Sequence, residues 1–290
     1  MFDVRYHLLS LVAVFLALVI GLLLGVAIGD RGLVSNAERE LRADLREDVE
    51  AARADARDMR EELQRRQRYE QQSYPAVVGY RLAGRRVAVL TVGPPDTETF
   101  QHVRDAVTPA GAEVAFVGRL RLPLDLERLA AVAPGTDAET LERSPDTLAD
   151  VARRMGEQIV AGGGMARDER RALFASSSGA LDGAEAVVLI RGAPPDDRAA
   201  DDVEREDEFL QALIDGLRSF DTPVAGVERL ESEPSQVDWY RERAVSSVDN
   251  VDQVAGRAAL VLVLAGGGTG AYGVKPGTQA LLPETLVSEP

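Results

Sequence analysis

The distribution of apolar positions divides the chain into three parts, and the first part is a continuous apolar run. Residues 8–29 read LLSLVAVFLALVIGLLLGVAIG and contain no charged side chain. A helix needs about 20 apolar residues to cross the hydrocarbon core of a bilayer. The apolar segment of a cleaved secretory signal is shorter, about 7 to 15 residues. The run therefore predicts a transmembrane helix at 8–29 that follows a short N-terminal tail at 1–7.

Small residues recur every fourth position within this predicted span, which places them on one face of the helix. They are Ala17, Gly21, Gly25 and Gly29. Small residues at this spacing let two helix backbones approach closely, so the pattern favours dimerisation in the membrane. The alternative is that glycine is simply common in membrane helices.

A charged helical stalk is predicted to follow, over residues 30–74. Its apolar or small residues are separated by three or four positions, the spacing of a coiled coil with one interruption. The predicted interface residues are Leu41, Leu45, Val49, Ala52, Ala56, Met59 and Leu63. A single solvated helix with intrahelical ion pairs remains the alternative. We expect the helix to span 33–72 and to end before Tyr74-Pro75, because proline disfavours its continuation.

Residues 75–290 show a different pattern, in which short runs rich in β-branched residues alternate with helical segments. The predicted strands are 86–92, 112–118, 184–192, 223–228 and 244–248, and the predicted helices include 97–108, 200–220 and 252–265. Residues 122–181 read as mostly helical, with a helix start at Ser144-Pro145 and a break at 162–164. Alternating strands and helices predict an α/β domain with a Rossmann-like or flavodoxin-like parallel sheet and helices on both faces.

Two similar loops suggest a candidate crevice in this domain. Gly-Pro-Pro-Asp at 93–96 follows the first predicted strand, and Gly-Ala-Pro-Pro-Asp at 192–196 follows the third. Open α/β sheets bind ligands at the carboxyl ends of their strands. The predicted crevice rim comprises Asp96, Asp196, Asp197, Asp249 and Asn250. Proline and aspartate are also the residues that a strand-to-helix turn needs for itself, which is the alternative.

Composition and two incomplete motifs argue against a nucleic-acid partner, cysteine chemistry and catalysis. The formal net charge of -15 disfavours a nucleic-acid partner, and the lack of cysteine excludes disulfides, thiolate sites and cysteine nucleophiles. The glycines of GTGAYG at 268–273 match a dinucleotide fingerprint, but Pro276 follows where a helix should open. SSSG at 176–179 lacks a nucleophile elbow. We therefore expect no enzyme activity and no cofactor.

Three segments resemble a known family. They are MFDVRYHLLSLVAVFLALVIGLLLG at the start, RRVAVLTVGPPDTETFQHVRDAVTPAGAEV, and AVSSVDNVDQVAGRAALVLVLAGGGTGAYGVK. They resemble the actinobacterial MctB family, the mycobacterial copper transport protein B or copper transporter family. This resemblance implies one membrane anchor, an extracytoplasmic coiled coil and α/β domain, and a role in copper efflux and copper homeostasis at the cell envelope.

The same family is similar to SteB, which is a partner of a cytoplasmic protein in corynebacterial cell separation. A non-enzymatic dimeric scaffold in cell separation or envelope maintenance is therefore the alternative function. The partners that we expect are the lipid bilayer, a second copy of the chain, and a cytoplasmic or envelope protein.

The role in copper efflux rests on the resemblance alone, and the residues do not identify any metal ligand. Copper prefers thiolate, thioether and imidazole ligands. The chain has no cysteine, histidine only at positions 7 and 102, and methionine only at 1, 59, 155 and 165.

Membrane orientation is also ambiguous from the sequence. Arginines at 31, 39, 42 and 46 follow the span, against Arg5 before it, which favours a cytoplasmic domain. Long domains translocate largely regardless of charge, so we follow the resemblance and expect a single-pass protein of the cell membrane with most of the chain outside the cytoplasm.

Overall fold

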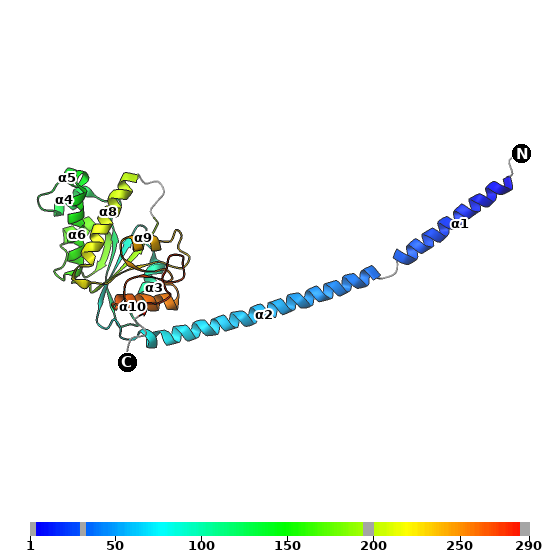
Figure 1. The fold of residues 1–290 in the computed structure, drawn as a ribbon, viewed down its shortest axis with the longest axis horizontal. Coiled ribbons are helices and arrows are strands. Elements are labelled where there is room, and N and C mark those ends of the chain that lie inside the picture. The colour runs from blue at the N-terminus through cyan, green and yellow to red at the C-terminus, as the bar shows by residue number, and fades with distance from the viewer. Residues whose placement is uncertain (1–3, 30–32, 194–199, 285–290) are drawn as a thin grey trace. The chain divides into compact units, whose positions relative to one another are not determined.

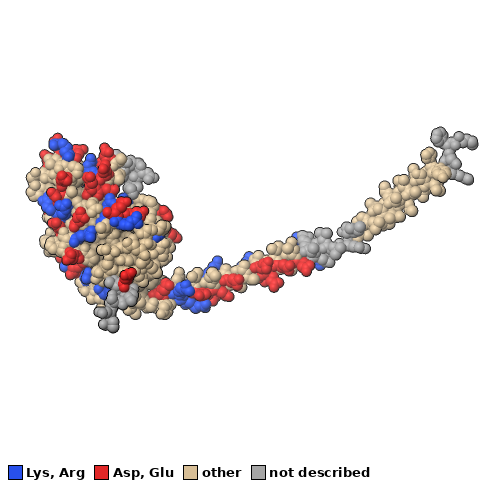
Figure 2. Space-filling view, viewed as in Figure 1, with Lys and Arg blue, Asp and Glu red and all other residues tan. Residues whose placement is uncertain are grey.

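The computed structural model describes residues 4–29, 33–193 and 200–284, and the chain divides into two compact units, 1–68 and 69–290. The first unit contains α1 (Val4–Gly29) and the larger part of α2 (Leu33–Val78) (Figure 1). Within the described residues, α1 is the one helix whose length and composition suit a membrane span, over Tyr6–Ala27. Figure 2 shows no charged side chain along this helix, whereas acidic and basic side chains cover α2.

Helix α2 does not end where the sequence predicts. It continues past Pro75 to Val78, so the expected end at residue 72 is wrong. The last turns of α2 belong to the second unit, where Tyr74 and Val78 are buried. The Tyr74 hydroxyl also donates to the carbonyl of Ala106 at 2.9 Å. This packing offsets the hydrogen bond that proline removes from a helix.

The predicted coiled-coil positions lie exposed along α2. Leu41, Leu45, Val49, Met59 and Leu63 each keep about half of their surface or more accessible. Ion pairs four residues apart also occur on this helix, between Arg65 and Glu61 and between Arg66 and Glu62. A single chain is compatible with both interpretations of the stalk, so the coiled coil stays a prediction.

The second unit is built on a seven-stranded sheet with the order β3-β2-β1-β4-β5-β6-β7. All neighbouring strands are parallel except β3, which runs antiparallel to β2. The strands are β1 (Arg86–Val92), β2 (Glu113–Leu120), β3 (Phe174–Gly179), β4 (Ala186–Arg191), β5 (Val224–Val227), β6 (Ser246–Val248) and β7 (Ala271–Tyr272). The predicted α/β class with a mostly parallel sheet is confirmed.

Helices cover both faces of this sheet. Helices α3 (Thr97–Val107) and α10 (Val254–Leu264) pack on one face, and α6 (Pro145–Val160) and α8 (Ala200–Leu217) pack on the other (Figure 1). The shorter helices are α4 (Leu126–Val132), α5 (Ala138–Arg143), α7 (Arg167–Leu173) and α9 (Val237–Glu242). Alternate residues of β1 supply the two cores, since Val89 faces α3 and α10 whereas Leu90 faces α6 and α8.

The connections that leave β1 and β4 progress in opposite directions along the sheet, to β2 on one side and to β5 on the other. Helix α3 follows β1 on one face, whereas α8 follows β4 on the opposite face. This arrangement makes the carboxyl ends of β1 and β4 the topological switch point, where open α/β folds place their crevice. The two predicted loops meet there, because the Gly192 N–H donates to the carbonyl of Val92 at 3.0 Å.

Local signals locate several element ends correctly, whereas four elements differ from the prediction. Asp96 caps α3 through the Thr99 N–H, and Ser144 caps α6 with Pro145 in its first turn. The expectation that 122–181 is mostly helical omits β3, and the sequence patterns do not predict α9 or β7. The predicted helix 200–220 ends at Leu217 and is followed by a 3-10 turn, η1 (Ser219–Asp221).

Candidate functional site

Asp96 lies at the carboxyl end of β1, where it serves the local turn. Its carboxylate accepts the Thr99 backbone N–H at 2.9 Å and the Thr99 hydroxyl at 2.6 Å. Its other neighbour is Arg229, whose Nε lies 4.0 Å away and whose guanidinium also pairs with Glu98. These contacts therefore fit the alternative interpretation, in which Asp96 is a residue that caps a helix.

A cleft of about 310 Å³ opens beside Asp96, over the strands at the β3 edge of the sheet. Phe100 of α3 and Asp96, which caps that helix, line it together with Arg119 of β2 and residues 176–178 of β3. Among the described residues, Asp96 is the one predicted rim residue that lines this cleft, which lies over β1, β2 and β3 and not between the two predicted loops. Asp196 and Asp197 lie outside the described residues.

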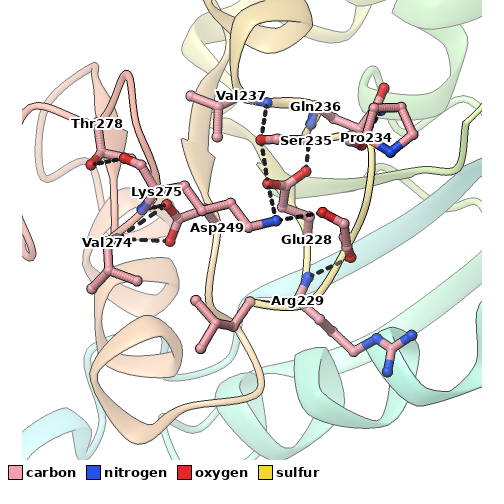
Figure 3. A network of polar contacts seen from close by, with 12 residues as sticks. Glu228, Arg229, Pro234, Ser235, Gln236, Val237, Asp249, Val274, Lys275 and Thr278 are labelled. Atoms are coloured by element: carbon pink, nitrogen blue, oxygen red, sulfur yellow. Dashed lines mark hydrogen bonds and ion pairs between the residues drawn. The ribbon is translucent and has the colours of Figure 1, made fainter.

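Asp249 and Asn250 do not rim a crevice, because both side chains are fully buried. The Asp249 carboxylate accepts the backbone N–H groups of Val274 and Lys275 (Figure 3). The Asn250 backbone carbonyl accepts the Gln253 N–H at 2.9 Å just before α10 begins, and its side-chain amide donates to Gln253 Oε1 at 3.2 Å. The prediction of an exposed rim is therefore wrong at these two positions. Both residues do follow β6, but each one binds backbone or side chains of its own chain.

A buried ion pair next to Asp249 was not predicted. Lys275 Nζ lies 2.9 Å from Glu228 Oε1, and the two side chains are only 9% and 3% exposed (Figure 3). Lys275 also donates to the carbonyl of Ser232 at 2.8 Å. Glu228 accepts the Ser235 hydroxyl at 2.7 Å and the Gln236 N–H at 2.6 Å. Lys275 is the only lysine of the chain, which is the one sequence signal that could have drawn attention to it.

We call the set Glu228, Asp249, Gly273 and Lys275 the C-terminal clasp. Both carboxylates come from residues that directly follow parallel strands, and both bind the segment around Lys275. A buried charge is tolerated when it is paired and hydrogen-bonded. The contacts of the clasp satisfy its charges internally, so the arrangement holds the chain beyond β7 against the carboxyl ends of β5 and β6.

A second polar cluster surrounds Trp239 of α9. The guanidinium carbons of Arg243 and Arg191 lie 4.1 Å and 4.5 Å from the centre of its ring. Asp207 accepts the indole N–H at 3.1 Å and pairs with Arg243 at 3.3 Å. Burial lowers the pKa of Arg191, and the nearby Arg243 lowers it further, whereas Asp207 raises it. The cluster therefore places two cations on one aromatic ring beside the end of β4.

The described residues do not assemble a copper site. No group of three or more histidine, aspartate or glutamate side chains that could hold a metal ion occurs among them. Met155 and Met165 are buried in the apolar core between the sheet and α6, with 4% and 6% exposure. Methionine commonly fills gaps in such cores. His102 lies on α3, apart from both methionines in the packing, because α3 covers the opposite face.

The fold and the N-terminal apolar helix together define the class: an α/β-domain protein with a helix that fits a single-pass membrane anchor. The chain belongs to the family described as "Copper transport outer membrane protein, MctB", whose family model matches residues 1–283. The resemblance noted in the sequence is thereby confirmed, and with it a relation to copper transport in the envelope. No curated protein matches the chain.

Proposed function

We propose that the chain is a single-pass, membrane-anchored protein of the cell envelope that contributes to copper efflux and copper homeostasis without being an enzyme. The observation that carries the proposal is the family match, which runs from the apolar helix at the start through the α/β domain. The α/β domain would lie outside the cytoplasm. The polar clusters support a non-enzymatic role, because their hydrogen bonds and ion pairs hold the fold together.

A dimer fits this proposal better than a pore formed by one chain. One helix cannot enclose a channel, and residues 8–29 carry a single polar side chain, Ser10. A methyl group added at Gly21 or Gly25 would have no other group within 4 Å, so their face of α1 is free to meet a second helix. The exposed apolar residues of α2 would continue the same association along the stalk.

The small-residue face can be tested by blocking close approach. Gly21→Leu combined with Gly25→Leu should weaken self-association of the full chain in membranes, because leucine separates the two backbones. Val19→Leu with Val26→Leu is a matched control that adds bulk away from this face. Equal cross-linking of the glycine double variant and the control would contradict a dimer through this face.

Cellular function is tested by deleting the gene and restoring it. Loss of the protein should raise sensitivity to copper, and the full chain should restore resistance. A strain that keeps normal copper resistance but fails to separate its cells would reject the copper role.

That second outcome would support the alternative, a dimeric scaffold in cell separation or envelope maintenance. The observation that favours the alternative is the lack of a converging metal-ligand group among the described residues. A scaffold requires a protein partner, cytoplasmic or in the envelope, rather than a metal site.

A further inference from the structure

Strand β3 forms an open edge of the sheet. It pairs with β2 on one side and is the first strand in the sheet order. Five of its six residues are exposed, and only Phe174 is buried. Within the described part of the chain, the backbone of residues 175–178 has no hydrogen-bonded backbone neighbour other than β2.

The edge lacks the features that usually prevent strand pairing. Exposed edges normally carry charged residues or proline, or are covered by another segment. Residues 175–179 are Ala-Ser-Ser-Ser-Gly, without a charge or a proline. The opposite edge differs, because β7 is only two residues long and a bridge between Tyr272 and Ala280 covers it. One edge of the sheet is therefore closed and the other is free to accept a strand.

The hydrogen-bond pattern shows which backbone groups of β3 face outward. The Ala180 N–H donates to the carbonyl of Ala115 at 3.0 Å. Because an antiparallel ladder alternates, the backbone groups of Ser176 and Ser178 then face β2, and those of Ser177 face away from it. The carbonyl of Gly179 fits this alternation, since it accepts a hydrogen bond from the outward side, from Arg170 at 3.3 Å.

We infer that β3 pairs antiparallel with β3 of a second copy, across a two-fold axis through Ser177. Two-fold contacts use the same surface of both chains, so the surface must be complementary to itself. Residues 175–179 meet this condition, because every antiparallel pairing places a small neutral side chain opposite another one. Keeping all five residues opposite one another puts Ser177 on the axis, where its outward N–H and carbonyl meet those of the partner.

The proposed contact is too small to hold two free domains together. Stable interfaces bury at least about 1,000 Å² in total, which a five-residue strand does not reach. The inference therefore rests on the membrane-anchored dimer proposed above, which raises the effective concentration of one domain for the other. For this reason, the contact must be tested in the full chain in its membrane.

Arginines near β3 give the contact a distinct salt dependence. Arg121 donates to the carbonyl of Phe174 at 3.0 Å, and Arg170 binds the opposite end of the strand. A second copy brings like charges near these ends, so added salt should favour the pairing by screening their repulsion. An acidic strand from another protein would respond in the opposite way, because salt would weaken its attraction to the arginines.

Single cysteines provide the test, because the chain has none of its own. In the full chain in membranes, treatment with diamide should join Ser177→Cys into a disulfide-linked dimer. Residues paired directly across two antiparallel strands have Cα atoms about 5.5 Å apart, within the range of a disulfide. Ala175→Cys is the matched control on the same exposed strand, and its two copies would lie about 14 Å apart. We expect at least a tenfold difference in dimer yield, and the yield at 177 should increase with salt.

Leu45→Cys on the stalk separates this inference from the proposed dimer. If Leu45→Cys cross-links and Ser177→Cys does not exceed Ala175→Cys, the dimer stands and the edge pairing is overturned. If neither Leu45→Cys nor Ser177→Cys cross-links, the dimer and the edge pairing that rests on it are both rejected. A yield at 177 that falls with salt would also overturn this pairing between copies, because like charges near the ends of the paired strands predict the reverse.

Discussion

Gly273 lies so close to the carboxylate of Asp249 that a side chain at position 273 would collide with it. Its backbone φ is +135°, in the region that favours glycine. The carboxylate occupies the space beside Gly273 because it binds the next two backbone N–H groups, those of Val274 and Lys275. The third glycine of the GTGAYG motif therefore has a structural role, which is to admit a buried carboxylate.

Replacing this glycine should destabilise the domain. We expect Gly273→Ala to lower the free energy of unfolding by about 2 to 4 kcal/mol, because backbone strain and collision with Asp249 add together. Gly266→Ala is the matched control, since its φ is +96° and nothing lies within 4 Å of an added methyl group. Urea unfolding followed by circular dichroism measures both. Equal losses in the two variants would show that the collision with Asp249 does not matter.

The ion pair of the C-terminal clasp should be sensitive to loss of one partner. Lys275→Met leaves the Glu228 carboxylate buried without its cation, so we expect a loss of about 3 to 5 kcal/mol in unfolding free energy. Adding Glu228→Gln should recover part of that loss, because no buried charge then remains unpaired. Arg66→Met provides the control, since its ion pair with Glu62 is exposed and should contribute less than about 1 kcal/mol. Additive losses in the double variant would contradict a coupled pair.

Alkaline pH should destabilise the domain through two buried tyrosines. Burial raises the pKa of Tyr240 and of Tyr74, and each hydroxyl donates to a backbone carbonyl, Leu189 for Tyr240 and Ala106 for Tyr74. Above the ordinary tyrosine pKa near 10, the unfolded chain releases protons that the folded chain retains. Stability should therefore fall as the pH rises above about 10, by about 1.4 kcal/mol per pH unit for each tyrosine.

Tyr240→Phe should reduce the fall of unfolding free energy with pH by the part that Tyr240 contributes. The variant also loses a hydrogen bond at every pH. Tyr80→Phe changes an exposed tyrosine and serves as the control. Unfolding free energies measured from pH 8 to 12 test the prediction. A slope that is unchanged by Tyr240→Phe would contradict it.

Copper binding by the protein itself should be weak. Because the described residues bring no metal-ligand group together, we expect the full chain in detergent to bind cuprous copper no better than a generic acidic protein. Competition with a chromogenic copper chelator measures the affinity. Met155→Leu combined with Met165→Leu should leave the result unchanged, because both side chains are buried. Stoichiometric binding with submicromolar affinity would reject this prediction and favour direct transport by the chain.

Topology can be determined with single cysteines. If the stalk lies outside the cytoplasm, Arg57→Cys should react with a membrane-impermeant thiol reagent when only the outer envelope is permeable. Arg57 is exposed on α2, so the added thiol is accessible. Asp3→Cys, on the other side of the span, should react only after the cytoplasmic membrane is lysed. The reverse labelling pattern would place the α/β domain in the cytoplasm.

Much of the fold could be predicted because its signals are local. The β-branched runs of β1 and β4, the Asp96 cap and the Ser144-Pro145 helix start each lie within a few residues of the element that they define. Strand β3 gave no such signal, since FASSSG has one buried residue and no β-branched residue. Its strand conformation depends on pairing with β2, which lies far away in the sequence.

The polar site was less predictable because its partners are distant in the chain. Glu228 and Lys275 are 47 positions apart, and only the folded sheet brings them together. The sequence correctly places Asp249 after a strand, but its burial depends on the return of residues 273–275 over β6. Pro75 shows the converse, because a reliable local signal for a helix end is overridden by the packing of Tyr74 and Val78.

Trp239 is the only tryptophan of the chain, and two guanidinium groups lie against its ring. Its fluorescence is therefore a natural optical reporter of the region beside the end of β4. Any molecule that displaces Arg191 or Arg243 would change the emission without an attached dye. Candidate partners and metal ions can thus be screened on the unmodified protein, including those for which no assay of function exists.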